Sequence, residues 1–459
     1  MNLVNYYRKI SKFPERNSRK RNLSIIAYLL SRLYILILVD KNTLYIIRLY
    51  MLKVLHVNFS DLNGGAAIGV NRLHNALIKM GIDSKVLVAE KLSQDLNIIG
   101  PTNTFEIIIS QLKISLSRFL KRNLIKTDNK ETFSFNFFNT NILKKINKIN
   151  ADIVHIHWIG NEMLSISQLK KINKPVVWTF WDMWPYCGAE HHSYDNRYID
   201  GYNKSNRPKN ERGLDLNRFI WNYKKKKLDF DFAIIAISKS IFQMIKQSKL
   251  HKHRQIFHIP PNLDTSVWKP RDKTLSKKLF GLNENKKILL FGSATATNNR
   301  KGFDFLLNLF EKQKFNNIEL IIFGEKPKRI NDLNIDYKYV GTLKDNYSLN
   351  LLYSAADIML VPSKIEAFGQ IGLEANSCGT PCVIFENTGP ADYTKHKENG
   401  YVAKYLDVKD YANGISWILD DEERFQKISN SCIDNVRNNY NDKLIGEKII
   451  QTYEKLLKK

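Results

Sequence analysis

Glu366-Ala-Phe-Gly-Gln-Ile-Gly-Leu-Glu374 is the stretch that decides the fold of this 459-residue chain. An apolar run before it, residues 357–363, predicts a buried strand, and the helix after it is expected to end at Cys378-Gly379, where glycine suits the C-cap. A strand that turns into a helix leaves free backbone N–H groups at the helix N-terminus, and the helix dipole adds to their attraction for anions. The pattern therefore predicts a diphosphate site beside Gly369, where glycine lets the backbone approach the ligand closely.

The two glutamates of this stretch are predicted to lie on either side of the anion site. Glu374, one to two turns into the helix, leans back toward the helix N-terminus, where it can accept hydrogen bonds from ribose hydroxyls. Glu366 lies in the loop, where it can meet a sugar beyond the phosphates. The simpler interpretation is that both carboxylates only favour a helix N-terminus through the dipole.

Length and composition predict a globular protein of two domains with extensions. A chain of 459 residues is too long for one ordinary core, and 43% hydrophobic with 25% charged residues is typical of folded proteins. Lys+Arg 71 against Asp+Glu 45 gives +26, which suggests an anionic partner, although runs such as Lys224–Lys227 are more often solvated faces. Four cysteines form no disulfide or zinc pattern, which fits a reducing compartment: Cys187, Cys378, Cys382 and Cys432.

Residues 1–50 are interpreted as an extension outside the fold. A basic stretch, Arg16–Arg21, precedes an apolar segment, Leu23–Val39, that Arg32 interrupts. The segment is shorter than the roughly 20 apolar residues that a membrane-spanning helix needs. A signal-anchor, a membrane-surface helix and a wrongly assigned start codon all stay open.

An alternation of strands and helices from residue 51 predicts a parallel sheet with helices on both faces. Between the first strand, 52–58, and a helix at 71–80 lies the pair Gly64-Gly65. This position faces the carboxyl ends of the strands, where ligands bind in such sheets. Residues 101–150 have helical apolar spacing and carry no predicted chemistry. Further strands are expected at 84–89, 153–157, 176–180 and 232–237.

A second α/β unit is predicted from residue 256, so the domains are 51–255 and 256–440. The segment 256–264 is expected to leave the first domain through a rigid Pro260-Pro261 turn. Helices close the chain, and the last, 441–459, is expected to pack back on the first domain. Two such domains facing each other leave a cleft, a usual place for ligands. The elements of this unit are expected at 287–292, 303–314, 318–323, 337–340, 346–355, 382–385, 408–419 and 421–439.

The segment Val361–Val383 resembles the E-x7-E signature of family 4 retaining glycosyltransferases, which have the GT-B fold of two Rossmann-like domains around a cleft. The resemblance covers roughly residues 51–459. It includes Gly64-Gly65-Ala66-Ala67, Arg300-Lys301-Gly302 and the strand end at His155–Trp158. The stretch Trp178–His191 is similar to a subgroup that builds exopolysaccharide and capsule, the colanic-acid type.

The resemblance implies three catalytic residues: His157, Glu366 and Lys301. A leaving diphosphate needs positive groups around it, and Lys301 with Arg300 is placed to supply them. The family usually has a further arginine where this chain has Ser293, and Arg300 is expected to replace it. His157 matches the family histidine near the sugar and acceptor, where a neutral imidazole can orient a hydroxyl.

Two further sets of residues follow from the resemblance. On the acceptor side lie Asp182 and His191, with Trp181 at a position where the subgroup often has histidine. Glu190 and His192 are adjacent to His191, and adjacent positions do not have the usual spacing of zinc ligands. These residues are therefore interpreted as part of a loop that lines the acceptor site. The segment 387–392 is expected to line the nucleotide end of the cleft. The nucleotide-sugar site is predicted to comprise Gly64, Gly65, Arg300, Lys301, Glu366, Phe368, Gly369, Gln370 and Glu374.

The resemblance implies transfer, with retention, of a sugar from a UDP- or GDP-sugar to a glycan or lipid-linked acceptor in cell-surface polysaccharide synthesis. No cofactor or metal is expected, because the sequence has no Asp-x-Asp motif where a metal-dependent transferase would need one. The expected location is the cytoplasm at the inner face of the membrane, where the basic chain contacts anionic lipid rather than nucleic acid. An epimerase or a phosphorylase on the same fold and, less favoured, a nucleic-acid-binding protein stay open as alternatives.

Overall fold

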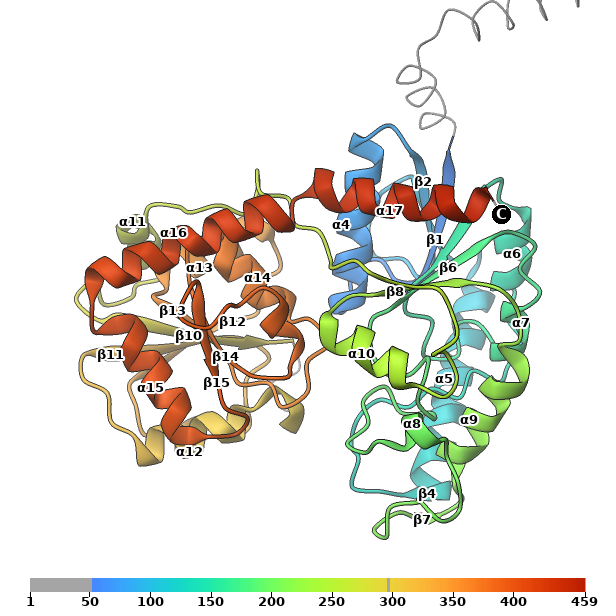
Figure 1. The fold of residues 1–459 in the computed structure, drawn as a ribbon, viewed down its shortest axis with the longest axis horizontal. Helices are drawn as coiled ribbons and strands as arrows, with labels where there is room; N and C mark the ends of the chain where they lie inside the picture. The colour runs from blue at the N-terminus through green and yellow to red at the C-terminus, as the bar shows by residue number, and fades with distance from the viewer. Residues whose placement is uncertain (1–51, 295–297, 459) are drawn as a thin grey trace, which may run out of the picture. The chain divides into compact units, whose positions relative to one another are not determined.

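Two parallel sheets organise the chain, which confirms the predicted α/β class (Figure 1). The computed structural model describes residues 52–294 and 298–458, so the interpretations of residues 1–50 lie outside the described residues. From Lys53 onward the chain forms a single compact unit that contains both sheets.

The first sheet has seven strands in the order β3-β2-β1-β5-β6-β8-β9. All neighbouring strands pair in parallel, and the central runs β5 and β8 are buried on both faces, as parallel strands between helix layers are. Its strands are β1 (Lys53–Ser60), β2 (Asp83–Glu90), β3 (Ile98–Ile99), β5 (Ile153–Ile156), β6 (Val176–Phe180), β8 (Ala233–Ala236) and β9 (Ile256–His258).

The helix after the first strand, α4, starts six residues before the predicted position 71. Gly64 has φ 91°, a conformation that favours glycine, and the helix begins directly after it. Residues 101–150 contain the longest helix of the described chain, α5. The helices of this half are α4 (Gly65–Lys79), α5 (Thr104–Leu124), α6 (Ile142–Lys148), α7 (Ile166–Leu169), α8 (Arg197–Asp200), α9 (Leu216–Lys227) and α10 (Lys239–Gln247), with a small antiparallel pair β4 (Ile125–Lys126) and β7 (Arg212–Gly213).

The second sheet has six parallel strands in the order β12-β11-β10-β13-β14-β15. Its strands are β10 (Lys287–Ser293), β11 (Ile318–Gly324), β12 (Tyr337–Gly341), β13 (Ile358–Val361), β14 (Cys382–Phe385) and β15 (Gly400–Ala403). Its helices and 3₁₀ turns are α11 (Lys273–Leu279), η1 (Asn299–Lys301), α12 (Phe303–Lys312), η2 (Ile330–Asp332), α13 (Asn346–Ala355), α14 (Gln370–Ser377), η3 (Gly389–Asp392), α15 (Val408–Leu419), α16 (Glu422–Asn439) and α17 (Asp442–Leu457).

The predicted boundary at residue 256 is wrong by one strand. Ile256–His258 pairs in parallel with Ile234–Ala236 and so completes the first sheet rather than leaving it. The sequence analysis also missed β15, whose four residues are too few to form a clear alternating pattern. The crossing from the first sheet to the second therefore follows His258.

The last helix, α17, packs against the first half of the chain. The Tyr453 hydroxyl lies 2.6 Å from Nδ1 of His155 in β5. Gly446 approaches the end of α4 so closely that a Cβ there would lie 2.4 Å from the Met80 sulfur. A contact between α17 and the first sheet is thus built from residues almost 300 positions apart in sequence.

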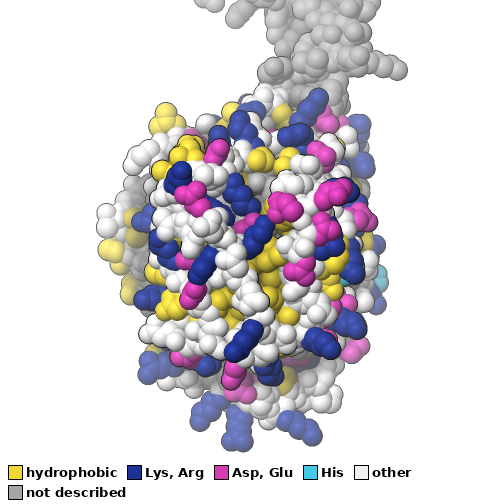
Figure 2. Space-filling view, turned by 90° about the vertical axis from the view of Figure 1, so that its left-hand side faces the viewer, with side chains coloured by type: hydrophobic (Ala, Val, Ile, Leu, Met, Phe, Trp, Pro, Cys, Tyr) yellow, Lys and Arg dark blue, Asp and Glu magenta, His cyan; other side chains and the backbone are white. Residues whose placement is uncertain are grey.

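The surface of the second half carries mixed charges. Figure 2 shows one face of the molecule, on which Lys and Arg side chains alternate with Asp and Glu and with small apolar areas. The four cysteines are buried and unpaired. Of the helices in residues 52–294 and 298–458, none combines the length and apolar character that crossing a bilayer requires.

Candidate active site

An ion pair between Lys301 and Glu366 joins two loops at the ends of β10 and β13. The Lys301 ammonium lies 2.6 Å from a carboxylate oxygen of Glu366. Gly302 explains the approach, because a Cβ there would lie 1.9 Å from the carbonyl oxygen of Pro362, at the end of β13. Only a glycine lets the turn that carries Lys301 pack this closely on the loop that carries Glu366. The structure therefore brings these two predicted residues together.

Opposing effects set the charge of this pair. Burial alone would raise the pKa of Glu366, but the cations of Lys301 and Arg300 outweigh burial and lower the pKa to about 2. Burial lowers the pKa of Lys301, and the attraction of Glu366 opposes that change. Glu366 is therefore a carboxylate throughout the physiological pH range.

Arg300 lies beside the pair and interacts with carboxylates from both halves of the chain. One guanidinium nitrogen donates to the carbonyl of Ile365 at 3.0 Å and lies 3.7 Å from Glu366. Another lies 3.5 Å from the carboxylate of Glu131, which comes from the segment before β5. Arg300 is thus positioned next to Glu366, while Glu131 is a partner that the sequence analysis did not consider.

The helix that follows, α14, begins at Gly369 as predicted. Gly369 has φ 76°, and α14 has neither a side-chain cap nor an acidic residue in its first turn. The Tyr393 hydroxyl donates to the Gly369 carbonyl at 2.7 Å and so fixes the turn. This helix start is therefore suited to an anion.

Phe368 is placed differently from the prediction. Its ring is buried against Tyr393 and Tyr440, so the side chain belongs to the core beneath the turn. Only its backbone can face a ligand. The segment 387–392 packs on this turn, because the Gly389 amide donates to the Glu366 carbonyl at 2.8 Å.

Glu374 is buried and lies in a network that reaches the first half of the chain. One carboxylate oxygen accepts from Tyr353 at 2.8 Å, and the other accepts from Arg72 of α4 at 2.6 Å. Arg72 also donates to the side chain of Gln370 at 2.9 Å. Since Gln370 and Glu374 are four residues apart on one helix, a single guanidinium bridges both.

The Gly64-Gly65 loop meets this network at its edge. The Gln370 amide donates to the Gly65 carbonyl at 2.5 Å, and a Cβ on Gly64 would meet no atom within 4 Å. Gly64 therefore borders open space beside α14. The loop and the start of α14, which were predicted to share a ligand, lie next to each other.

On the acceptor side, the structure brings Asp182 and His191 together. Nδ1 of His191 lies 2.6 Å from an Asp182 oxygen, and its other nitrogen lies 2.8 Å from the Ser134 hydroxyl. Trp158 donates to the same Asp182 oxygen at 2.7 Å. Burial would raise the pKa of Asp182, but His191 outweighs it and the pKa is lowered. Both side chains are buried, so they form a rigid support rather than an exposed pair.

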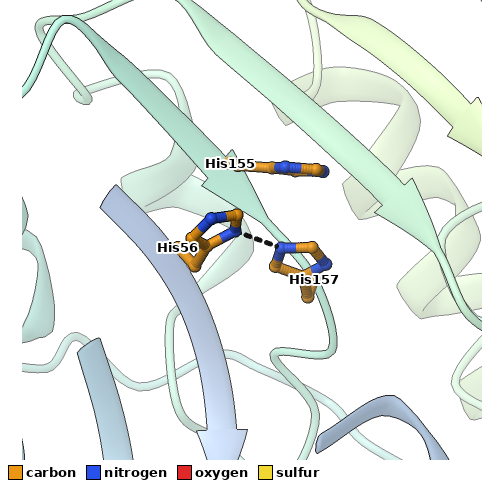
Figure 3. Close-up of side chains that lie close together, drawn as sticks. All are labelled: His56, His155 and His157. Atoms are coloured by element: carbon orange, nitrogen blue, oxygen red, sulfur yellow. Dashed lines mark hydrogen bonds between the residues drawn. The ribbon is translucent and has the colours of Figure 1, made fainter. Parts of the chain in front are cut away.

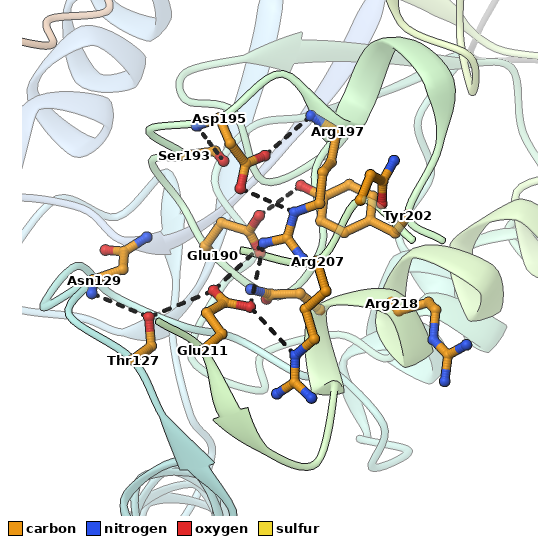
Figure 4. A network of polar contacts seen from close by, with 12 residues as sticks. Thr127, Asn129, Glu190, Ser193, Asp195, Arg197, Tyr202, Arg207, Glu211 and Arg218 are labelled. Carbon is orange, nitrogen blue, oxygen red and sulfur yellow. Dashed lines mark hydrogen bonds and ion pairs between the residues drawn. The ribbon is translucent and has the colours of Figure 1, made fainter. Parts of the chain in front are cut away.

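Lys224 fixes the loop that carries these residues, which corrects its interpretation as part of a solvated basic face. It is fully buried, and its ammonium donates to the carbonyls of Trp184, Cys187 and Gly188, the last at 2.6 Å. Burial lowers the pKa of Lys224 to about 7. Figure 4 shows the adjoining network, in which Arg197 lies 2.9 Å from Asp195.

His157, which is predicted to be catalytic, is held by hydrogen bonds in the structure. The indole N–H of Trp181 donates to Nδ1 at 3.2 Å, so the proton is on Nε2, which lies 2.9 Å from Nδ1 of His56 (Figure 3). Both ring nitrogens are therefore occupied, and only 2% of the residue is exposed. Burial lowers the pKa of His157 well below its usual value, so the imidazole is neutral.

The three histidines His56, His155 and His157 could in principle hold a metal, because one nitrogen of each lies within 4.8 Å of the others. Existing hydrogen bonds argue against this. His155 is engaged by Tyr453 and by Thr179 at 2.7 Å, and His157 is engaged at both nitrogens. Zinc would need three nitrogens at about 2.0–2.1 Å and would have to replace these contacts. The arrangement is that of a hydrogen-bonded core.

Comparison with known proteins identifies the family. Residues 63–267 match the family described as Glycosyltransferase Family 4, and residues 272–438 match the family described as Glycosyl transferases group 1. Together these two matches span most of the chain and both of its sheets. The chain belongs to glycosyltransferase family 4.

Individual relatives of this family 4 protein are distant. N-acetyl-alpha-D-glucosaminyl L-malate synthase of Bacillus anthracis is 27% identical over 42% of this chain and 50% of its own length. Glycogen synthase of Alkaliphilus metalliredigens is 24% identical over 86% of this chain and 96% of its own length. The first curated relatives match over about half of their own length or less.

Solved structures of similar proteins share the fold. Sucrose-phosphate synthase from Thermosynechococcus elongatus has a TM-score of 0.65 and 17% identity, with 88% of this chain and 99% of that chain covered. HepE from Anabaena, in complex with UDP and glucose, has a TM-score of 0.58 and 14% identity, with 88% and 100% covered. At this identity the likeness shows the GT-B fold alone.

Sequence reasoning missed several residues of the family 4 site. Arg72, Glu131 and Tyr353 lie in no motif, and each contacts a predicted residue from another element of the chain. His192 lies among charges of the donor side and the acceptor side. Burial, and then the charge of Arg300, lower its pKa to about 3, while the carboxylates of Asp182 and Glu366 act in the opposite direction. Its Nδ1 is buried without a hydrogen-bond partner. The adjacent histidine pair His191-His192 was the one sequence signal for it.

Proposed function

We propose that this family 4 protein is a retaining glycosyltransferase that uses a nucleoside-diphosphate sugar as donor. The observation that carries the proposal is the Lys301–Glu366 ion pair at 2.6 Å beside the uncapped start of α14, with Glu374 one turn further along. A diphosphate needs cations and N–H donors, a ribose needs an acceptor of hydrogen bonds, and a sugar needs a carboxylate at hydroxyl distance. Glu366, the start of α14 and Glu374 follow one another along one loop and helix, and Lys301 reaches this loop from the end of β10.

Each residue has a distinct part in the proposed reaction. The diphosphate binds at the start of α14, and Lys301 turns from Glu366 toward the phosphate oxygens as negative charge develops on the leaving group. Glu366, released from this contact, holds the donor sugar. Glu374, oriented by Tyr353 and Arg72, accepts the ribose hydroxyls. The bond from the anomeric carbon to the phosphate oxygen breaks as the acceptor oxygen bonds to that carbon, and the leaving phosphate takes the acceptor proton.

The acceptor is proposed to be a lipid-linked glycan in cell-surface polysaccharide synthesis and to enter from the side of Asp182 and His191. Because the Asp182–His191 pair is buried, we assign it the support of the loop. We assign His192, whose pKa responds to charges of both the donor and the acceptor side, a place between the two sides. The net charge of +26 favours an anionic membrane surface at the cytoplasmic face as the place where donor and lipid-linked acceptor meet.

A binding screen tests the donor. Isothermal titration with UDP, GDP and ADP, followed by their sugars, is expected to give one nucleotide with the tightest dissociation constant. Glu374→Ala should weaken that nucleotide, whereas Glu366→Ala should lower turnover more than nucleotide binding. Equal effects of the two substitutions on binding and turnover would contradict the assigned roles.

Product analysis tests the reaction itself. With the tightest donor and a mixture of glycan acceptors, the expected product is a glycoside with the anomeric configuration of the donor. Turnover is expected to continue in EDTA, because Lys301, Arg300 and the start of α14 supply the positive charge. Isomerisation or hydrolysis of the donor that proceeds equally well without any acceptor would favour an epimerase or hydrolase instead.

A further inference from the structure

Helix α5 carries a stripe of large apolar side chains on its exposed face. Spacings of three and four residues place these side chains on one side of the helix over four turns. Each is between 43% and 69% exposed, although residues of this kind are usually covered. The opposite face, with Ile114 and Ser117, is buried against the protein. The α5 stripe consists of Phe105, Ile108, Leu112, Leu116 and Phe119.

The charges around the α5 stripe are almost all positive. Between Thr104 and Lys126 the sequence has five basic residues and one acidic residue, Glu106. That carboxylate is neutralised by Lys145 at 2.6 Å. Arg118 and Arg122 are exposed on the same helix, to one side of the stripe. An exposed apolar face thus lies beside unpaired positive charge.

We propose that the α5 stripe docks on an anionic lipid surface. An amphipathic helix that lies in a bilayer interface inserts its aromatic and aliphatic side chains, while Arg and Lys beside them meet acidic headgroups. A second copy of the chain would also cover apolar side chains, but it would bring the same excess of positive charge against Arg118 and Arg122. Charge complementarity therefore favours lipid over a second copy.

The run Lys224–Lys227 does not form one continuous basic face, because Lys224 is buried. Docking on lipid would bring the acceptor side of the first sheet to a lipid-linked acceptor. Only this purpose of docking rests on the proposed function. Binding to vesicles can be measured without donor or acceptor. A failure of docking is thus distinguishable from a failure of the proposed reaction.

Vesicle co-sedimentation of the full chain tests the docking surface. The probe is a vesicle of phosphatidylglycerol and phosphatidylcholine, compared with phosphatidylcholine alone. The triple variant Leu112→Gln, Leu116→Gln, Phe119→Gln is expected to lower partitioning to the anionic vesicle at least tenfold. The matched control is Leu275→Gln with Leu279→Gln, because these leucines of α11 are equally exposed, at 54% and 61%. The control should stay within twofold of the unchanged protein.

A second measurement keeps the proposal testable if the triple variant folds poorly. The four native cysteines are buried, so a cysteine introduced as Leu112→Cys can be labelled with an environment-sensitive dye. The dye is expected to shift to the blue on anionic vesicles, and a dye at Asn438→Cys, on the exposed face of α16, should not shift. Unchanged partitioning of a folded triple variant, or no shift at position 112, overturns the proposal. A dimer that the α5 stripe holds together in the presence of vesicles, detected by sedimentation, would also overturn the proposal.

Discussion

Glu366 and His157 both have hydrogen-bond partners in a largely covered site, yet the partners differ in kind. Glu366 exposes 12% of its side chain and pairs with the cation of Lys301, on a loop next to the start of α14. His157 exposes 2% and pairs with neutral groups, Trp181 and His56, beneath that indole. The Lys301 cation can exchange its carboxylate partner for a phosphate of a ligand. The neutral imidazole of His157, enclosed in the core, has no comparable partner to exchange. The first arrangement is suited to chemistry and the second to stability.

The largest expected effect is that of Lys301→Met on turnover. Removal of the cation that faces the leaving diphosphate should lower kcat by about 100- to 1000-fold. Steady-state kinetics with the identified donor measure it. Lys364→Met is the matched control, because Lys364 lies on the neighbouring loop and pairs with Asp304 at 2.6 Å instead. If the kcat of the Lys301 variant stayed within threefold of that of the unchanged protein, Lys301 would have no larger part in turnover than is predicted for His157.

Next in size is the effect of Glu374→Gln on nucleotide binding. A hydrogen bond to a charged acceptor contributes about 1.5–3 kcal/mol, so the dissociation constant should rise about 10- to 150-fold. Titration calorimetry measures it, and Glu386→Gln, on an exposed turn, serves as the control. An unchanged dissociation constant would place the ribose elsewhere.

The bridge formed by Arg72 is expected to couple to Glu374. In a double-mutant cycle of Arg72→Met with Glu374→Gln, the coupling free energy for nucleotide binding should be about 0.5–3 kcal/mol, because one guanidinium orients the carboxylate. Additive effects of the two substitutions would show that Arg72 only joins the two halves of the chain.

For His157, the contrast predicts a loss of stability rather than of turnover. His157→Phe leaves the N–H of Trp181 and a nitrogen of His56 without partners, which should lower the free energy of unfolding by about 1–3 kcal/mol per unsatisfied group. Urea denaturation measures it beside kcat. A fall in kcat as large as that of Lys301→Met, at unchanged stability, would restore His157 as a catalytic group and break the comparison.

The smallest expected effect is a dependence of stability on pH. Burial lowers the pKa of His155 to about 3, so the folded protein binds no proton there while the unfolded chain does below its usual pKa near 6.5. Stability is therefore complete above pH 6.5 and decreases as the pH falls, by about 1 kcal/mol from pH 6.5 to 5.5 for this one residue. Urea midpoints of His155→Gln should fall less steeply over that interval than those of the unchanged protein. Parallel curves would contradict the assignment.

The sequence predicted the strand, turn and helix around Glu366 to Glu374 well, because the information for them is local. Glu366, Gly369 and Glu374 lie within nine residues, and the strand, turn and helix around them are set by apolar spacing and glycine. Lys301 was predicted from a short motif, and Gly302 explains why the motif packs where it does. The two parallel sheets followed from the alternation of strands and helices.

The rest depends on contacts between distant segments, which no local pattern records. Arg72 and Glu374 are 302 residues apart, and nothing around Arg72 distinguishes it from other surface arginines of a helix. Lys224 appears in a run of four lysines, and only the fold shows that its ammonium is enclosed by carbonyls. The sequence does not show that the indole N–H of Trp181 donates to His157.

The hydrogen bond between His155 and Tyr453 has a consequence for biosynthesis. The two residues are separated by 298 positions, so a ribosome that adds about 5–20 residues per second makes Tyr453 some 15–60 s after His155. During that interval the nascent amino-terminal sheet lacks the helix that covers His155. Its exposed apolar surface is then a natural substrate for chaperones, and slower translation of the intervening segment would lengthen that dependence.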